Sequence, residues 1–178
     1  MRIFLTSAIA AAVFTSGAMA QPPEMKPGAE HKRLAHFVGQ WKFEGESKAS
    51  PMGPAGKWTG TETCEWFAGS FHVVCNSKGT GPMGAQTGHA IMGYDPMEKG
   101  YTYYGISSRG EGYYVKGSVS GNVWTWTSEM MMEGKPAKFR VTVTEDSPTA
   151  HSFKMEASFG GGPMTVVEEG KSTKISKS

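Results

Sequence analysis

The 178-residue sequence carries almost no excess of charge, with a formal net charge of +2 at pH 7. A near-neutral chain lacks the basic surface that nucleic-acid binders use, so we expect no nucleic-acid partner. Membrane-spanning runs are missing too. The apolar run at residues 3–14 is too short to cross a bilayer, so we expect no transmembrane segment in the mature chain.

Catalytic motifs are also missing. Serine, histidine and aspartate all occur, but no Gly-x-Ser-x-Gly turn follows a strand pattern. No pair of carboxylates stands in a recognisable acid/base arrangement, and no His-x-His or spaced His/Cys cluster indicates zinc. We therefore predict that the protein is not an enzyme, with no catalytic residue, no metal site and no bound cofactor.

Methionine, in contrast, is frequent, with 12 residues and a consecutive run at 130–132. Thioethers are soft ligands for Cu(I), but consecutive residues of a strand point to opposite faces and do not converge on one ion. We expect these flexible side chains to line an apolar cavity or a hairpin end.

The first twenty residues have the parts of a secretory signal. Arg2 precedes the apolar run at 3–14, and Ala18-Met19-Ala20 forms a small-x-small cleavage site. We expect cleavage of the signal peptide (1–20) after Ala20, a flexible mature terminus at 21–26, and a periplasmic or secreted protein. No cysteine follows the cleavage site, which argues against a lipid anchor.

Only two cysteines are present, and export to an oxidising compartment favours a disulfide between them. A hairpin centred on Gly69-Ser70 places Cys64 opposite Cys75, at a Cβ separation of about 4.5–5.5 Å. A two-residue loop puts this pair at a hydrogen-bonded site, whereas a four-residue loop, 68–71, puts it at the closer, non-hydrogen-bonded site. Two buried free thiols are the alternative.

The rest of the chain is dominated by strand and turn patterns. Glycine is abundant, at 24 residues, and Val, Thr, Tyr and Trp are frequent, which indicates short strands and tight turns. Alternating runs recur roughly every 8–12 residues, and no second long helix is indicated. We predict an all-β fold: a single antiparallel up-and-down β-barrel of about ten strands, a size that encloses a cavity for a small ligand.

The barrel is expected to begin at Gly39-Gln40-Trp41. Before it, Pro27–Val38 carries Leu34, Phe37 and Val38 at helical spacing, which predicts a short N-terminal helix of about three turns. Gly39 supplies the left-handed residue that commonly ends a helix. From Trp41 the apolar period changes to two, as in a strand.

This junction resembles the Gly-x-Trp motif of the calycins, the superfamily of lipocalins and fatty-acid-binding proteins, in which the Trp plugs one barrel end. A longer resemblance is to a secreted, lipocalin-like bacterial family, domain-of-unknown-function family 1579. It rests on Lys26-Pro27-Gly28-x-Glu30-His31-Lys32-Arg33-Leu34, Gly53–Lys57, Thr63-Cys64-Glu65-Trp66-Phe67, Gly79–Gly84 and Met92-Gly93-Tyr94-Asp95-Pro96. The resemblance implies a lipocalin-like barrel domain at 27–174 and an exported location, but no reaction.

Related barrels hold their ligands with single side chains. Nitrobindin-type barrels hold haem with one histidine, which makes His89 and His151 the candidates for a minority haem-binding hypothesis. Fatty-acid-binding relatives hold a carboxylate with an inward arginine, but Arg140 alternates with apolar neighbours, which predicts that it points outward. His31 and His36 fall on the predicted helix and are expected to be solvated.

Large aromatic residues are more numerous than a small interior needs for packing alone. We predict that the barrel binds a small hydrophobic or amphipathic ligand without turnover. The predicted ligand-binding wall consists of Trp41, Phe43, Trp66, Tyr103, Trp124, Trp126, Phe139 and Phe153. The alternative is a structural barrel, filled by its own side chains, that presents a surface to an envelope protein.

Overall fold

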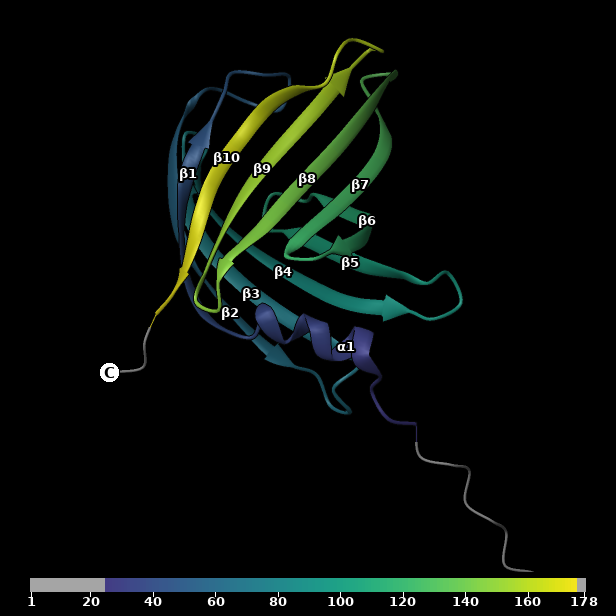
Figure 1. Ribbon diagram of the computed structural model, residues 1–178. Helices are drawn as coiled ribbons and strands as arrows, with labels where there is room; N and C mark the ends of the chain where they lie inside the picture. The colour runs from purple at the N-terminus through teal and green to yellow at the C-terminus, as the bar shows by residue number, and fades with distance from the viewer. Residues whose placement is uncertain (1–24, 176–178) are drawn as a thin grey trace, which may run out of the picture.

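The computed structural model describes residues 25–175, in which ten antiparallel strands close into a barrel (Figure 1). Each strand pairs with the next, and β1 pairs with β10 to complete the ring. The strands are β1 Gly39–Ser47, β2 Gly56–Trp66, β3 His72–Gly81, β4 Gly84–Asp95, β5 Gly100–Ser107, β6 Gly112–Ser120, β7 Val123–Met132, β8 Lys135–Ser147, β9 Ala150–Phe159 and β10 Thr165–Lys174. The predicted all-β barrel is confirmed. The expected signal peptide, and residues 21–24 of the expected flexible terminus, lie outside the described residues.

The N-terminal helix is shorter than the sequence predicts. α1 spans Ala29–Arg33, and a 3₁₀ turn, Leu34–His36, follows it. The amides of Phe37 and Val38 bond to carbonyls three residues back, so this tighter turn replaces the last part of the predicted α-helix. The helix lies across one end of the barrel (Figure 1), and Leu34 is fully buried there. In the described part of the chain, no helix combines the length and apolar character needed to cross a membrane.

Trp41 closes the helix-covered end, as the Gly-x-Trp resemblance implies. Its side chain is 1% exposed, and its Nε1 donates a 2.7 Å hydrogen bond to the carbonyl of Phe37. The ammonium of Lys174 lies 4.9 Å from the indole centre. Gly39 bends the chain just before it with a φ of +135°, a value that favours glycine.

His36 is packed into this end rather than solvated, which corrects the sequence-based expectation. Its side chain is 6% exposed, and its Nδ1 lies 3.7 Å from a carboxylate oxygen of Glu145. Burial lowers the pKa of His36, and burial also lowers the pKa of the adjacent His151, to about 4. His31 likewise packs edge-on against Phe71. The short helix therefore supplies imidazole rings that help to seal the end.

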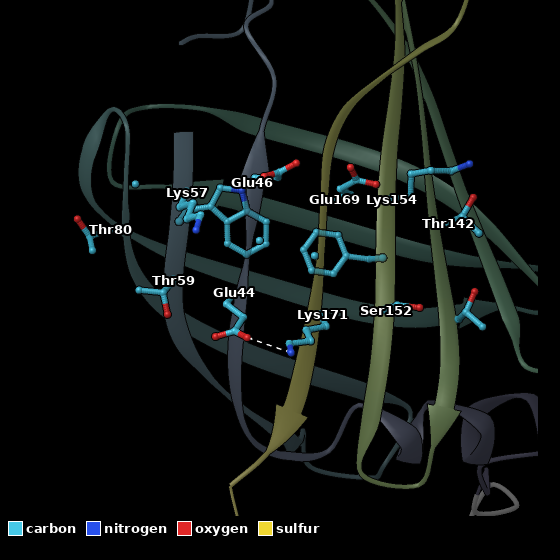
Figure 2. A pocket seen from close by; sticks show the side chains of 16 residues that line it. Glu44, Glu46, Lys57, Thr59, Thr80, Thr142, Ser152, Lys154, Glu169 and Lys171 are labelled. Atoms are coloured by element: carbon cyan, nitrogen blue, oxygen red, sulfur yellow. Dashed lines mark ion pairs between the residues drawn. The ribbon is translucent and has the colours of Figure 1, made fainter. Parts of the chain in front are cut away.

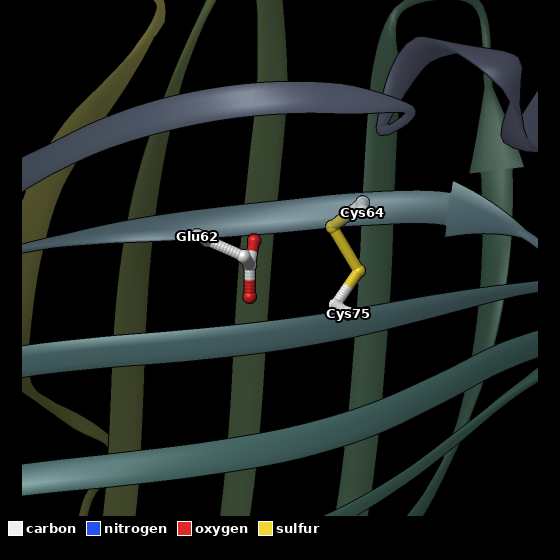
Figure 3. Close-up of side chains that lie close together, drawn as sticks. All are labelled: Glu62, Cys64 and Cys75. Atoms are coloured by element: carbon white, nitrogen blue, oxygen red, sulfur yellow. A yellow bond between two sulfur atoms is a disulfide. The ribbon is translucent and has the colours of Figure 1, made fainter.

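The hairpin of β2 and β3 has the predicted register. The amide of Phe67 donates a 2.8 Å hydrogen bond to the carbonyl of His72, which leaves a four-residue loop between them. Cys64 and Cys75 are paired directly and form a disulfide (Figure 3). Their Cα atoms are 4.1 Å apart, as at the closer, non-hydrogen-bonded site. The four-residue alternative is therefore the correct one.

Candidate functional site

The two halves of the barrel interior are packed differently. Near the helix, inward side chains such as Val73 and Trp124 have no exposed surface. Toward the opposite end, Tyr113 is 42% exposed and Met130 is 41% exposed, although strand register places both on the inward face. The interior is thus filled at the helix end. At the other end Tyr113 and Met130 are accessible, beside a second buried cluster that contains Ala137 and Ala157.

The large inward rings lie flat against the barrel wall. A Cβ atom on Gly117 would collide with the ring of Trp126, and one on Gly60 would collide with the ring of Phe43. The same relation holds for Tyr113 over Gly105 and for Trp58 over Gly45 and Gly170. Because each ring occupies the space that a glycine leaves free, it lines the wall instead of crossing the interior.

The eight aromatic residues predicted to bind ligand all face inward, but they do not share one environment. Trp41 and Trp124 are buried at the helix end, and Phe139 belongs to a separate buried cluster with Ala137 and Ala157. These three rings pack mainly against other side chains, and their role in ligand binding stays a prediction. Of the others, Trp126 is 5% exposed, and partly accessible surface remains on Phe43, Trp66, Tyr103 and Phe153.

The acidic residues of the interior were not predicted from the sequence. Glu62 faces inward together with Cys64, and Glu168 faces inward from β10. The alternation of Cys64 and Trp66, extended back by one step, would have placed Glu62 on this face. Glu168 gives no such signal, because a β-bulge between Val166 and Glu168 shifts the alternation.

Within residues 25–175, the carboxylate of Glu62 has neither a hydrogen bond nor an ion pair. It lies beside the disulfide, within 4.8 Å of both sulfur atoms (Figure 3), and burial raises its pKa to about 7. The sulfur atoms of Cys64 and Cys75 are bonded to each other and are not available as thiolate ligands. The grouping is therefore a buried acid against an apolar disulfide and not a metal centre.

Two stacked tyrosines share the environment of Glu62. The ring centres of Tyr103 and Tyr113 are 5.9 Å apart, and their planes differ by 6°. Burial raises the pKa of Tyr103 well above its ordinary value, and the nearby Tyr113 and Glu62 raise it further. Burial also raises the pKa of Glu168, against the effect of a 3.5 Å hydrogen bond from Ser47 Oγ. The accessible interior thus combines aromatic faces with carboxyl and hydroxyl groups.

Basic side chains are scarce on the inward face. Arg140 is half-exposed and points outward, as its alternation predicts, and one of its terminal nitrogens lies 3.0 Å from Glu156. By register, the inward lysines of the described strands are Lys174, at the helix end, and Lys135, at the opposite rim. The groups closest to Glu62 are therefore acids and hydroxyls, and Trp41 of β1 separates Glu62 from Lys174.

A wide depression of about 1210 Å³ lies on the outer face of β2, β1, β10, β9 and β8 (Figure 2). Outward polar side chains surround it, and the rings of Trp58 and Phe153 also contribute to its lining. Lys171 and Glu44 form an ion pair of 3.1 Å across β10 and β1. Its other charged side chains also balance, with Glu46 and Glu169 against Lys57 and Lys154. We assign no site to this solvated, self-neutralising surface.

The two histidines of the haem hypothesis lie away from the accessible interior. His89 is exposed on the outer face, where its Nδ1 lies 2.9 Å from Asn76 Oδ1. His151 is at the helix end, with its ring centre 4.6 Å from that of Trp41 and its Nδ1 3.3 Å from His36 Nε2. Neither ring is placed to bind a haem held in the accessible half.

The fold and the interior together identify the class of protein. A closed, up-and-down antiparallel barrel, sealed at one end by a short helix and a Gly-x-Trp, is a lipocalin-like barrel. The model of a family of proteins of unknown function, DUF1579, matches residues 26–174, and the chain belongs to this family.

Solved structures support the fold. Rv2717c from M. tuberculosis is 12% identical, with a TM-score of 0.59, over 83% of this chain and 98% of that one. The S-type phycobiliprotein lyase CPES from Guillardia theta is 9% identical, with a TM-score of 0.56, over 84% of this chain and 93% of that one. Among curated protein sequences, none matches this chain. At these identities the likeness concerns the fold alone.

Proposed function

We propose that this protein is an exported barrel that holds a small amphipathic molecule in its accessible half and does not transform it. The observation that carries the proposal is the arrangement of inward rings over glycines. Phe43, Trp58 and Tyr113 lie against the wall, and Tyr113 keeps 42% of its surface exposed. Such faces favour an apolar ligand by about 25 cal/mol per Å² buried, before ordering costs.

The structural-barrel alternative has one observation in its favour. Ile91, Tyr104 and Tyr114 are neighbours by register on the outer face of β4, β5 and β6, and they are 37%, 52% and 40% exposed. An exposed apolar row suits contact with another protein. This alternative predicts that small apolar molecules do not enter the barrel.

Fluorescence titration with a neutral probe, N-pentyl dansylamide, separates the two functions. We expect a blue-shifted emission and a Kd on the order of 1–10 µM. Val115→Trp adds a large ring to the inward face and should weaken binding about tenfold or more. The control is Lys116→Trp, on the outward face of the same strand, which should bind as the parent does. A folded parent protein that ignores the probe would favour the structural barrel.

Export and the disulfide can be tested together. The motivation is the small-x-small pattern at Ala18-Met19-Ala20 and the direct pairing of Cys64 with Cys75. When the full chain is expressed in a bacterium, the periplasmic protein should begin at Gln21. Its intact mass should rise by about 2 Da on reduction, as expected for one disulfide. Retention of residues 1–20, or two thiols that react without reduction, would contradict these expectations.

A further inference from the structure

We propose that the interior site selects amphipathic amines, with Glu62 as the group that binds the ligand's ammonium. The inference rests on the proposed ligand-binding function and specifies the chemistry of that site. It would assign to the protein an organic cation with an apolar body, instead of a fatty acid or another anion.

Glu62 and Trp58 face inward, and neither side chain has a hydrogen-bond partner within residues 25–175. Glu62 lies beside an apolar disulfide and makes none of the hydrogen bonds or ion pairs found in residues 25–175, although its oxygens are not fully closed off from solvent. Independently, Nε1 of Trp58 is the one buried side-chain nitrogen or oxygen of residues 25–175 that has no hydrogen-bond partner. Buried polar groups are normally paired, and an unpaired one destabilises the fold. Glu62 can therefore accept hydrogen bonds from a ligand, whereas the N–H of Trp58 is a donor and would need an acceptor, which an ammonium does not offer.

The second step is the sign of the charge. Glu62 and Glu168 both face the interior, and the inward lysines, Lys174 and Lys135, lie at its two ends. A ligand carboxylate at Glu62 would therefore meet an acid, whereas Lys174 lies beyond Trp41 by register, with its ammonium 4.9 Å from the centre of that indole. An ammonium, in contrast, would pair with Glu62 in a region of low dielectric constant, where a charge-assisted hydrogen bond is strong.

The third step is the wall near Glu62. Tyr103 and Tyr113 present stacked aromatic rings, and their hydroxyls add hydrogen-bonding groups. Aromatic faces attract cations within about 6 Å of the ring centre. The same rings also bury the apolar part of the ligand, so one wall recognises both ends of an amphipathic amine.

The test uses three probes with one fluorophore: N-(5-aminopentyl) dansylamide, N-pentyl dansylamide and N-dansyl-6-aminohexanoic acid, which are cationic, neutral and anionic. At pH 8 we expect the cationic probe to bind about tenfold more tightly than the neutral one, and the anionic probe to bind most weakly. Glu62→Gln should abolish the preference for the cation, so that the cationic and neutral probes bind with the same affinity. Glu65→Gln, on the outward face of the same strand, is the control and should keep the preference.

Acidification gives a second readout. Glu62 is faced by Tyr103 from β5 and Tyr113 from β6, and Trp41 of β1 separates it from Lys174 of β10; neither tyrosine becomes a cation on acidification. The preference for the cation should therefore fall between pH 8 and pH 5 as the carboxyl groups gain protons. Equal binding of the three probes, or a preference that survives Glu62→Gln, overturns the inference while the ligand-binding function stands. Binding of none of them overturns both.

Discussion

Replacing Trp41 by alanine should lower the free energy of unfolding by about 3–5 kcal/mol. The indole is 1% exposed, and it closes the barrel between the helix and β10. Its loss would leave a cavity beside His151 and would remove the donor to the carbonyl of Phe37. Both effects act in the same direction, because a cavity forfeits packing and a buried carbonyl without a donor costs further free energy.

Urea denaturation followed by far-UV circular dichroism measures this change. Trp41→Phe separates the two effects, because it keeps a ring in the cavity but removes the indole N–H that bonds to Phe37. It should fall between the parent and Trp41→Ala. Gln40→Ala, at the exposed neighbouring position, is the control and should stay within about 0.5 kcal/mol of the parent. A Trp41→Ala protein as stable as the control would show that the indole does not seal this end.

Glu62→Gln should stabilise the protein at pH 8 by on the order of 2–3 kcal/mol and should have little effect at pH 4. Burial raises the pKa of Glu62 from 4.5 to about 7. In the unfolded chain the carboxyl therefore loses its proton near pH 4.5, whereas in the folded barrel it keeps the proton until about pH 7. As the pH rises through this window, the folded state becomes less favourable, and the neutral glutamine does not incur this cost.

The measurement is the difference in unfolding free energy between parent and variant at pH 4, 6 and 8. Taking the difference matters because His151, with a pKa lowered to about 4, makes the parent lose stability on acidification. That contribution is common to both proteins and cancels. Glu65→Gln, which changes an exposed carboxyl on the same strand, should show no such pH dependence. An equal effect of Glu62→Gln at all three pH values would mean that Glu62 ionises in the barrel as in the unfolded chain.

The barrel itself could be predicted because its signals are local. Alternation in Val123–Thr127 fixes which face is apolar, and the turn at Gly69-Ser70 fixes the partner of Cys64. A closed sheet then follows, since exposed edges are avoided when the strands form a ring. Even the outward position of Arg140 follows from alternation alone.

The functional interior was harder to predict because it depends on what the barrel brings together. Alternation alone assigned eight inward rings to the ligand wall, and it does not show that Trp41 and Trp124 are buried at the helix end. Flat packing of Trp58 over Gly45 and Gly170 involves three strands, so no local pattern reveals it. The surroundings of Glu62 likewise depend on side chains from several strands, so no local sequence pattern reveals them.

The predicted length of the N-terminal helix was wrong because apolar spacing does not distinguish an α-helix from a 3₁₀ turn. Leu34 and Phe37 are three residues apart, a spacing that suits both an α-helix and a 3₁₀ turn. The barrel end selects the tighter turn, which places His36 against Glu145. Tertiary packing therefore decided between two local structures with the same apolar spacing.

A crystal structure of the protein with N-pentyl dansylamide tests the central claim most directly. The account predicts that the naphthalene ring lies inside the barrel, in contact with Tyr103 and Tyr113 and on the same side of the sheet as Glu62. A probe bound instead on the outer face, over Tyr104 and Tyr114, would contradict the claim that the interior is the ligand site.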